Sequence, residues 1–243
     1  MNGCMIRMEG LTRKYGELEA VRGIDLAVPQ GEFFAFLGPN AAGKTTTIKM
    51  LAGLLKPTAG RAIVGGFDMQ TEAAEAKKVI AYVPDFPFLY DKLTPVEFMR
   101  FVGELFLMDR ADITLKTEML FEQMHLNEHR DQLIENLSHG TRQRVVISSA
   151  LLHDPKVIII DEPMVGLDPR HAAIVKQELK KRSAAGTTIF LSTHQLSVAE
   201  EMADRVAIIN HGKVIALGTV EELKGLSQEK GALEKVFLTL VGD

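Results

Sequence analysis

The feature that most limits how this chain can fold is a glycine-containing loop that lies between an apolar run and a helical pattern. The loop runs from Gly38 to Thr45 and matches G-x-x-x-x-G-K-[ST]. At ordinary residue frequencies, this pattern arises by chance in about one chain of this length in a hundred. Glycines let the main chain approach phosphate groups closely, and the following helix offers the positive end of its dipole. The sequence therefore predicts a strand–loop–helix unit that holds a nucleotide by its phosphates.

The positions of this loop have different expected roles. Lys44 is expected to reach the terminal phosphates, and the Thr45 hydroxyl is expected to coordinate Mg²⁺. The other loop residues are expected to contact the nucleotide, and they are Gly38, Pro39, Asn40, Ala41, Ala42, Gly43 and Thr46.

The segments around the loop indicate an α/β fold. Glu32–Leu37 is typical of a buried strand, and apolar side chains at helical spacing follow over residues 48–55. We expect Lys56-Pro57-Thr58 to end that helix. Val157–Ile160 and Thr188–Leu191 are apolar throughout, as are strands of a parallel sheet covered by helices on both faces. Polar residues follow both runs, so the active groups should gather at one edge of the sheet.

The middle of the chain is predicted to be helical. Thr94 and Glu97 form a capping-box pattern at the start of a helix. Its expected apolar face consists of Phe98, Phe101, Val102 and Leu105. We interpret the chain as a single domain, 1–243, in which residues 87–154 form a helical subdomain. This subdomain is inserted into a core made of residues 1–86 and 155–243.

The end of the chain is predicted to contain a hairpin and a helix. Arg205–Ile209 and Lys213–Leu217 are two strand-like runs joined through Asn210-His211-Gly212. Thr219, with Glu222 three residues later, is expected to begin a last helix.

Polar residues after the two buried strands are the candidate catalytic groups. Asp161 and Glu162 suit a Mg²⁺ ligand followed by a general base that activates the attacking water. The alternative is a pair of solvated carboxylates in a loop. His194 is expected to sense the terminal phosphate, and the alternative for it is a buried structural role.

With the segment Leu137-Ser138-His139-Gly140-Thr141, the chain resembles the ABC ATPases, whose signature is usually Leu-Ser-Gly-Gly-Gln. Five further motifs stand in the order that this family has. They are an aromatic loop at Tyr15-Gly16, the Walker A loop at Gly38–Thr46, the Walker B strand at Val157–Pro163, the D-loop at Gly166-Leu167-Asp168 and the switch histidine in Ser192-Thr193-His194. The resemblance covers essentially the whole chain.

The resemblance implies a P-loop NTPase of the ABC-cassette fold. Such a fold has a RecA-like core, an N-terminal antiparallel β portion and an inserted helical subdomain. It also implies that ATP and Mg²⁺ bind, that Tyr15 stacks on adenine, and that two copies dimerise head to tail. Ser138 and Gly140 of one copy would then face the γ-phosphate held by Lys44 of the other, with Asp168 communicating across the interface.

The implied function is that of an ATP-hydrolysing motor that drives a transmembrane permease, more in the manner of an exporter than of an importer. The permease would be a separate chain docked beside residues 85–108. The cassette would be peripheral at the cytoplasmic face of the membrane, as a homodimer or paired with a second cassette. The transported substrate is not encoded here, because it meets the permease.

Three positions depart from the family pattern. Ala41 replaces a common glycine, and its methyl group costs ~1–2 kcal/mol if the main chain needs a positive φ. Asp85 stands where the family has the Q-loop glutamine; it is expected to ligate Mg²⁺ directly or through a water, or else to cap a helix. His139 and Thr141 replace signature residues, and His139 is expected to lie at the rim of the site.

Composition restricts the other function classes. A net charge of -4 argues against nucleic acid as the main partner, because phosphate neutralisation needs a basic face. No apolar run approaches the ~20 residues that span a bilayer, so a membrane-spanning part would come from another chain. Two alternatives stay open. One is a soluble ABC ATPase acting on ribosomes or DNA, and the other is a regulatory or immunity subunit with little turnover.

Overall fold

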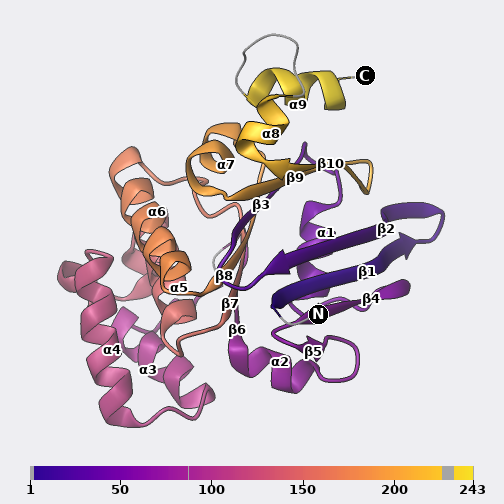
Figure 1. Ribbon diagram of the computed structural model, residues 1–243. Helices are drawn as coiled ribbons and strands as arrows, with labels where there is room; N and C mark the ends of the chain where they lie inside the picture. Colours follow the sequence, from indigo (N-terminus) through magenta and orange to yellow (C-terminus); the bar gives the residue numbers. More distant parts are fainter. Residues whose placement is uncertain (1–2, 87, 226–232, 243) are drawn as a thin grey trace.

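The computed structural model describes residues 3–86, 88–225 and 233–242, which form two β-sheets surrounded by helices (Figure 1). Pro87, where the predicted helical subdomain begins, lies outside the described residues. In spatial order the larger sheet contains β10 (Lys213–Thr219), β9 (Arg205–Asn210), β3 (Phe33–Leu37), β8 (Thr188–Thr193), β7 (Val157–Asp161) and β6 (Ile80–Val83). Neighbouring strands are parallel except β9 and β10, which form the predicted hairpin. The three predicted buried strands are thereby confirmed as β3, β7 and β8.

The smaller sheet is antiparallel and comes mostly from the N-terminal part of the chain. In spatial order it contains β2 (Leu18–Pro29), β1 (Cys4–Tyr15), β4 (Ala59–Val64) and β5 (Phe67–Asp68). Alternate residues of β1 face inward, so that Ile6 and Met8 are buried while their neighbours are less so. This alternation is typical of a sheet with one buried face, and it confirms the antiparallel β portion.

Helix α1 (Lys44–Leu51) lies between the two sheets, and its apolar side chains pack into one hydrophobic core. Its Ile48 and Leu51 are buried against the same cluster as Phe34 and Phe36 of β3. The predicted end of this helix at Lys56-Pro57-Thr58 was wrong. The helix ends at Leu51, and Gly53 follows with φ +66°, a left-handed conformation that terminates helices and that glycine adopts without strain.

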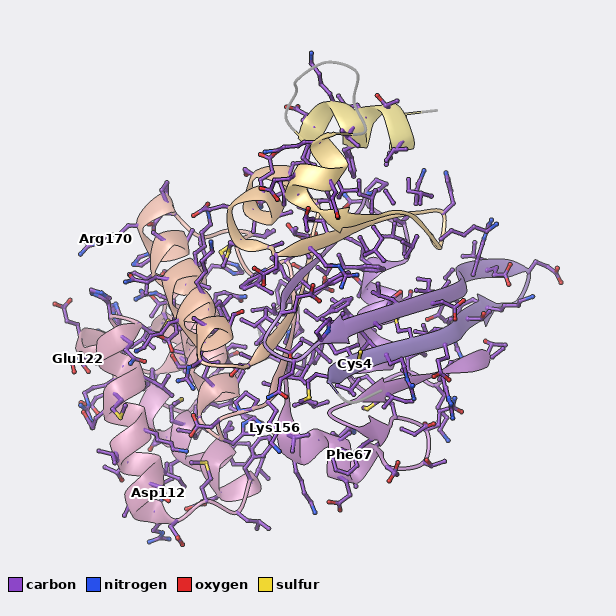
Figure 2. All side chains as sticks on the ribbon, in the orientation of Figure 1. Cys4, Phe67, Asp112, Glu122, Lys156 and Arg170 are labelled. Carbon is purple, nitrogen blue, oxygen red and sulfur yellow. The ribbon has the colours of Figure 1, made fainter. Side chains whose placement is uncertain are left out.

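The opposite face of the parallel sheet is covered by the helices at the left of Figure 1. They are α3 (Pro95–Leu105), α4 (Arg110–Gln123), α5 (His139–Leu151) and α6 (Pro169–Ala184), with short 3-10 helices at Asn127–His129 and Ile134–Asn136. In Figure 2 the labelled Asp112, Glu122 and Arg170 mark this helical side, and Cys4 and Phe67 mark the antiparallel sheet on the other. The described molecule therefore has a helical side and a β side around one parallel sheet.

Helix α3 begins as predicted but is less buried than predicted. Thr94 and Glu97 form the full capping box. Of the expected apolar face, Phe98 is buried, whereas Phe101 is 37% exposed and Leu105 is 65% exposed. The helical spacing identified the helix correctly, but the outer half of its apolar side chains lies at the surface.

The remaining helices of the described chain are short, with five to nine residues each. They are α2 (Ala73–Val79), α7 (Leu196–Met202), α8 (Val220–Lys224) and α9 (Leu233–Val241). Helix α8 starts at the predicted Thr219 capping box, but the prediction that it would be the last helix was wrong, because α8 ends at Lys224 and α9 follows it in the chain. Helices α7, α8 and α9 enclose a third apolar cluster over β3 and β9. Among the described residues, no helix combines the length and the apolar character that crossing a bilayer requires.

Candidate nucleotide-binding site

The Gly38–Thr45 loop connects β3 to α1, and main-chain crowding explains its glycines. A Cβ at Gly38 would lie 2.4 Å from the Ile209 carbonyl oxygen, and one at Gly43 would lie 2.5 Å from that of Ala20. Gly43 has φ +107° at the N-cap of α1. Because the first turn of a helix leaves N–H groups without partners inside the helix, this arrangement suits an anion bound by the main-chain amides of the loop.

Ala41 has a positive φ, the condition under which its methyl group was expected to cost free energy. Its φ is +63°, in the left-handed region that alanine rarely occupies. The loop therefore stores strain of ~1–2 kcal/mol at this residue.

The Lys44 ammonium is folded back onto the loop. Its Nζ donates to the carbonyl oxygens of Gly38 at 2.8 Å and Pro39 at 3.1 Å. Burial lowers the pKa of Lys44 below its ordinary value. Carboxylates that act on this pKa in the opposite direction are, in decreasing order, Glu162, Asp161 and Asp85. The predicted lysine thus lies among the predicted acidic residues.

Asp161 ends β7 and lies against Thr45 at the start of α1. Thr45 Oγ1 donates to Asp161 Oδ2 at 3.0 Å, and the aspartate is 1% exposed. Within the described residues, Asp161 Oδ1 has no hydrogen-bond partner. A buried carboxylate oxygen without a partner beside a threonine hydroxyl fits a hard cation, which prefers oxygen ligands. This donor set suits Mg²⁺.

Asp85 follows β6 and lines the same cavity as the phosphate loop. Its side chain is exposed. Burial raises the pKa of Tyr82 to about 12, and the charges of Asp161 and Asp85 add to that effect. Asp85 thus lines the same cavity as Thr45, and a role for Asp85 as a Mg²⁺ ligand stays a prediction.

Glu162 occupies a strained position next to Asp161. Its φ is +48°, in the left-handed region, which costs ~1–2 kcal/mol for a residue with a Cβ. Glu162 Oε1 lies 2.8 Å from His194 Nδ1 and 3.8 Å from Lys44 Nζ. Glu162 Oε2 accepts a hydrogen bond of 3.2 Å from Thr193 Oγ1. The carboxylate is thus surrounded by donors from α1 and from the end of β8.

These groups open into a cavity of about 420 Å³. Its lining residues are Tyr15, Leu18, Ala20, Asn40, Ala41, Gly43, Lys44, Thr45, Thr46, Asp85, Glu162, Val165 and His194. Gly38, Pro39 and Ala42 are not among its lining residues; Gly38 and Ala42 are buried, and Pro39 is half-buried. Volumes of ~300–1,000 Å³ are usual for small-molecule sites, so the cavity can hold a nucleotide.

Tyr15 lies at the mouth of this cavity, 45% exposed, with the Arg13 guanidinium 4.6 Å from its ring centroid. The sequence prediction missed its neighbour Leu18. Tyr15 and Leu18 are cross-strand partners at the turn between β1 and β2, so both side chains reach the same face. The antiparallel pairing around Gly16 is the signal that could have found Leu18.

Ser138 and Gly140 are not brought to this cavity. Ser138 is the N-cap of α5, where its Oγ accepts from Thr141 N at 3.2 Å and lies 2.9 Å from Thr141 Oγ1. Thr141 is 3% exposed and also accepts from Arg144. Thr141 therefore has a structural role at the start of α5, which accounts for one departure from the signature pattern.

The signature segment packs instead against the D-loop of the same chain. A Cβ at Gly166 would lie 2.6 Å from the His139 ring, and one at Gly140 would lie 3.3 Å from Leu167. Asp168 caps α6 through bonds to the N–H groups of Arg170 and His171. Its carboxylate also pairs with the His171 ring, and these bonds lower the pKa of Asp168.

Sequence comparisons agree with this geometry. A family profile described as ABC transporter matches residues 21–165. The chain is similar to the linearmycin resistance ATP-binding protein LnrL of Bacillus subtilis, with 35% identity over 219 residues that cover 90% of this chain and 70% of that protein. It is also similar to the Nod factor export ATP-binding protein I of Cupriavidus metallidurans, with 35% identity covering 90% of this chain and 72% of that protein.

Solved structures extend the similarity to the fold. An ATP-binding subunit of an ABC transporter superimposes with a TM-score of 0.91 at 29% identity, covering 97% of this chain and 99% of the other. The dimeric post-hydrolysis state of the ATP-binding cassette MJ0796, bound to ADP and Pi, has a TM-score of 0.79 at 26% identity. That alignment covers 88% of this chain and 98% of the other.

Proposed function

Because the chain belongs to the ABC transporter ATP-binding proteins, which bind and hydrolyse ATP, we propose that it is the motor subunit of an exporter and hydrolyses ATP in the cavity at Lys44. One observation supports this most. Lys44, Glu162 and His194, from three separate segments, meet within hydrogen-bonding or ion-pairing distance at the carboxyl ends of parallel strands. Open α/β sheets bind their ligands at that edge.

The proposed chemistry assigns one task to each side chain of the cavity. The amides of the Gly38–Thr46 loop hold the phosphates, and Lys44 leaves its two carbonyl partners to bind the terminal phosphate. Glu162 orients the attacking water and accepts its proton. His194 stabilises the γ-phosphate, and Tyr15 stacks on the adenine ring.

Mg²⁺ fits beside the phosphates. Thr45 and Asp161 would hold it, with Asp85 directly or through a water. When bound, it supplies positive charge that offsets the charge developing on the transferred phosphoryl group. Asp161 Oδ1, which has no hydrogen-bond partner among the described residues, supports this assignment.

The proposed active unit is a dimer of two cassettes in head-to-tail contact. Ser138 and Gly140 do not line the cavity of their own chain, and the start of α5 is exposed at Ser138. A helix N-terminus exposed in this way can accept a γ-phosphate held by a second copy. The dimeric state of the similar cassette bound to ADP and Pi supports the arrangement. ATP then joins the copies, and its hydrolysis releases them.

A permease on a separate chain is the proposed partner, and it would hold the cassette at the cytoplasmic face of the membrane. The supporting surface lies next to Asp85 and contains exposed aromatic and aliphatic side chains. Phe86, Phe88 and Leu107 are 78%, 89% and 92% exposed. A cavity of about 350 Å³ lies beside them and is lined by Phe88, Phe98 and Phe106 among others. Exposed apolar surface of this kind marks protein-interaction sites.

Steady-state ATPase assays on purified Glu162→Gln test the proposal. We expect kcat to fall about 10³-fold, because general-base catalysis contributes ~10²–10⁴. We also expect an ATP-bound dimer to accumulate in light-scattering measurements with ATP and Mg²⁺. Glu128→Gln, an exposed glutamate outside the cavity, is the matched control and should behave as wild type.

Two outcomes would contradict this function. Turnover of Glu162→Gln within twofold of wild type would remove Glu162 as the base. A wild-type chain without steady turnover would favour the nucleotide-responsive regulatory subunit over a motor.

A further inference from the structure

Thr193 stands at the point where the phosphate loop, the candidate base and the histidine loop meet. It is the last residue of β8 and is 2% exposed. Its carbonyl oxygen accepts from Gly38 N at 3.3 Å, which ties the end of β8 to the start of the phosphate loop. Its side chain bonds to both Gln195 and Glu162. The proposed chemistry assigns no task to this buried hydroxyl.

The direction of each hydrogen bond at this hydroxyl is determined by its partners. Gln195 N is a main-chain donor, so Thr193 Oγ1 accepts that bond, at 3.0 Å. A hydroxyl has a single proton and an ionised carboxylate only accepts. The Thr193 proton is therefore directed to Glu162 Oε2, at 3.2 Å. The Gln195 amide orients the hydroxyl, and the hydroxyl in turn orients the carboxylate.

The two oxygens of Glu162 have different partners. Oε1 lies 2.8 Å from His194 Nδ1 and 3.8 Å from Lys44 Nζ. Both of these groups are assigned to the γ-phosphate when ATP is bound. Oε2 is bonded to Thr193, which is buried and is not a candidate phosphate ligand. Binding of ATP would thus draw partners away from Oε1 while the bond at Oε2 persists.

The main chain at Glu162 increases the need for such an anchor. Glu162 has φ +48°, and its N–H donates to Ser192 O on β8 at 3.0 Å. The main-chain bond ties the residue to the end of β8, but it leaves the side-chain torsions free. Holding the carboxylate in one orientation requires a second contact, and Thr193 is the next residue along the same strand.

We propose that Thr193 is a positioning residue for ATP hydrolysis, whose hydroxyl anchors Glu162 Oε2 so that Oε1 faces the attacking water once Lys44 and His194 engage the γ-phosphate. The proposal rests on the proposed function, in which Glu162 is the general base. Thr193 itself touches neither ATP nor the water.

The test compares Thr193→Val, which keeps the shape and removes the hydroxyl, with Thr193→Ser, which keeps the hydroxyl. We expect Thr193→Val to lower kcat about 30-fold with KM for ATP changed less than about threefold, because misplacing a catalytic group by about 1 Å costs on the order of 10²-fold. Thr193→Ser should stay within about threefold of wild type. Thr117→Val is the matched control: Thr117 is 4% exposed, and its hydroxyl has no partner in the described chain.

A double-mutant cycle separates positioning from a structural defect. In the Glu162→Gln background there is no carboxylate base left to orient, so adding Thr193→Val should change the residual single-turnover rate by less than about twofold. A structural defect would lower that rate by the same factor as in the wild-type background. If Thr193→Val does not fold, as judged by thermal unfolding, Thr193→Ala replaces it with the same expectations.

The inference is overturned if Thr193→Val keeps kcat within twofold of wild type, if Thr193→Ser is impaired as much as Thr193→Val, or if the loss recurs undiminished in the Glu162→Gln background. Each of these results leaves Glu162 in place as the base. Failure of the proposed function would be recognised separately, because Glu162→Gln alone would then turn over ATP normally.

Discussion

The nucleotide cavity and the helical side of the molecule differ in how much of their surface the chain itself covers or pairs. In the cavity, polar side chains have hydrogen-bond partners; on the helical side, polar and apolar side chains are exposed. In the cavity, Lys44, Glu162 and His194 are already bonded to one another or to nearby main-chain oxygens. On the helical side, Ser138 is exposed at a helix start, and Phe88 is 89% exposed. These polar side chains of the cavity are thus paired within the chain, whereas the helical side has polar and apolar groups that the described residues leave exposed.

This difference follows from the way each region is built. The cavity lies at the carboxyl ends of β3, β7 and β8, where parallel pairing brings three polar segments together. The helical side is formed by helices whose inner faces enter the core and whose outer faces carry Phe101 and Leu105. A single chain therefore brings the catalytic groups together, and it leaves Ser138 and the exposed aromatic residues at its surface, where the proposed second cassette and permease would bind.

The largest expected effect comes from mixing two inactive variants. Lys44→Ala removes the phosphate contact in the cavity, and Ser138→Ala removes the signature hydroxyl. Each alone should lose at least about 10²-fold in kcat, by analogy with the removal of one donor to a developing anion. In a mixed dimer, one of the two sites combines an intact cavity with an intact signature segment. ATPase activity should reappear on mixing.

The mixture could instead show only the mean activity of the two separate variants. That result would contradict the proposed difference between the two regions, because it would place Ser138 at the cavity of its own chain. The control mixes the Lys44→Ala variant with a double variant that carries both Lys44→Ala and Glu162→Gln. This mixture should remain inactive, because both copies lack Lys44.

A smaller effect is expected at the exposed aromatic surface. Phe88→Ser should lower the amount of cassette that copurifies with its permease from detergent-solubilised membranes by about 10-fold, because removing a buried aromatic anchor from an interface costs ~2 kcal/mol or more. ATP binding by the isolated chain should be unchanged. Leu238→Ser, at an exposed apolar site on α9, is the control.

Equal loss of copurification for Phe88→Ser and Leu238→Ser would argue against a specific docking surface at the helical side. Loss of ATP binding by Phe88→Ser would show that the two regions are not as separate as the fold indicates.

The smallest effect is expected within the phosphate loop itself. Ala41→Gly should raise the free energy of unfolding by up to about 1 kcal/mol, since relief of the strain at φ +63° exceeds the entropy that glycine adds to the unfolded chain. Ala42→Gly is the matched control, because Ala42 is 3% exposed and has no positive φ. It should lose about 1 kcal/mol. Urea unfolding of both variants measures the difference, and a loss of stability in Ala41→Gly would contradict the strain assigned to the loop.

Predictions from short segments were the most successful. The Thr94–Glu97 capping box, the strands at Phe33–Leu37 and Val157–Asp161, and the hairpin after Arg205 are all present in the structure. Each depends on neighbouring residues, so the local sequence contains the information that forms it.

Predictions that depended on packing were less complete. The helix after the phosphate loop ends at Leu51 because Gly53 adopts φ +66°, although Leu55 still packs against the same core from outside the helix. The outer half of the apolar face of α3 is exposed. Periodicity shows which residues are apolar, but it does not show where a helix ends or which of its apolar side chains lie at the surface.

By itself, the sequence determined a nucleotide-binding α/β chain with a phosphate loop, an acidic strand end and a histidine after a second strand, because each of these is a local pattern. Only the tertiary structure decided that β3 lies between β8 and β9, that Glu162 takes a left-handed main chain, and that the Thr193 hydroxyl bonds to its carboxylate. The strand pairing and the Thr193–Glu162 bond join residues about 30 or more positions apart, and such pairings arise from the packing of whole elements and not from the preferences of neighbouring residues.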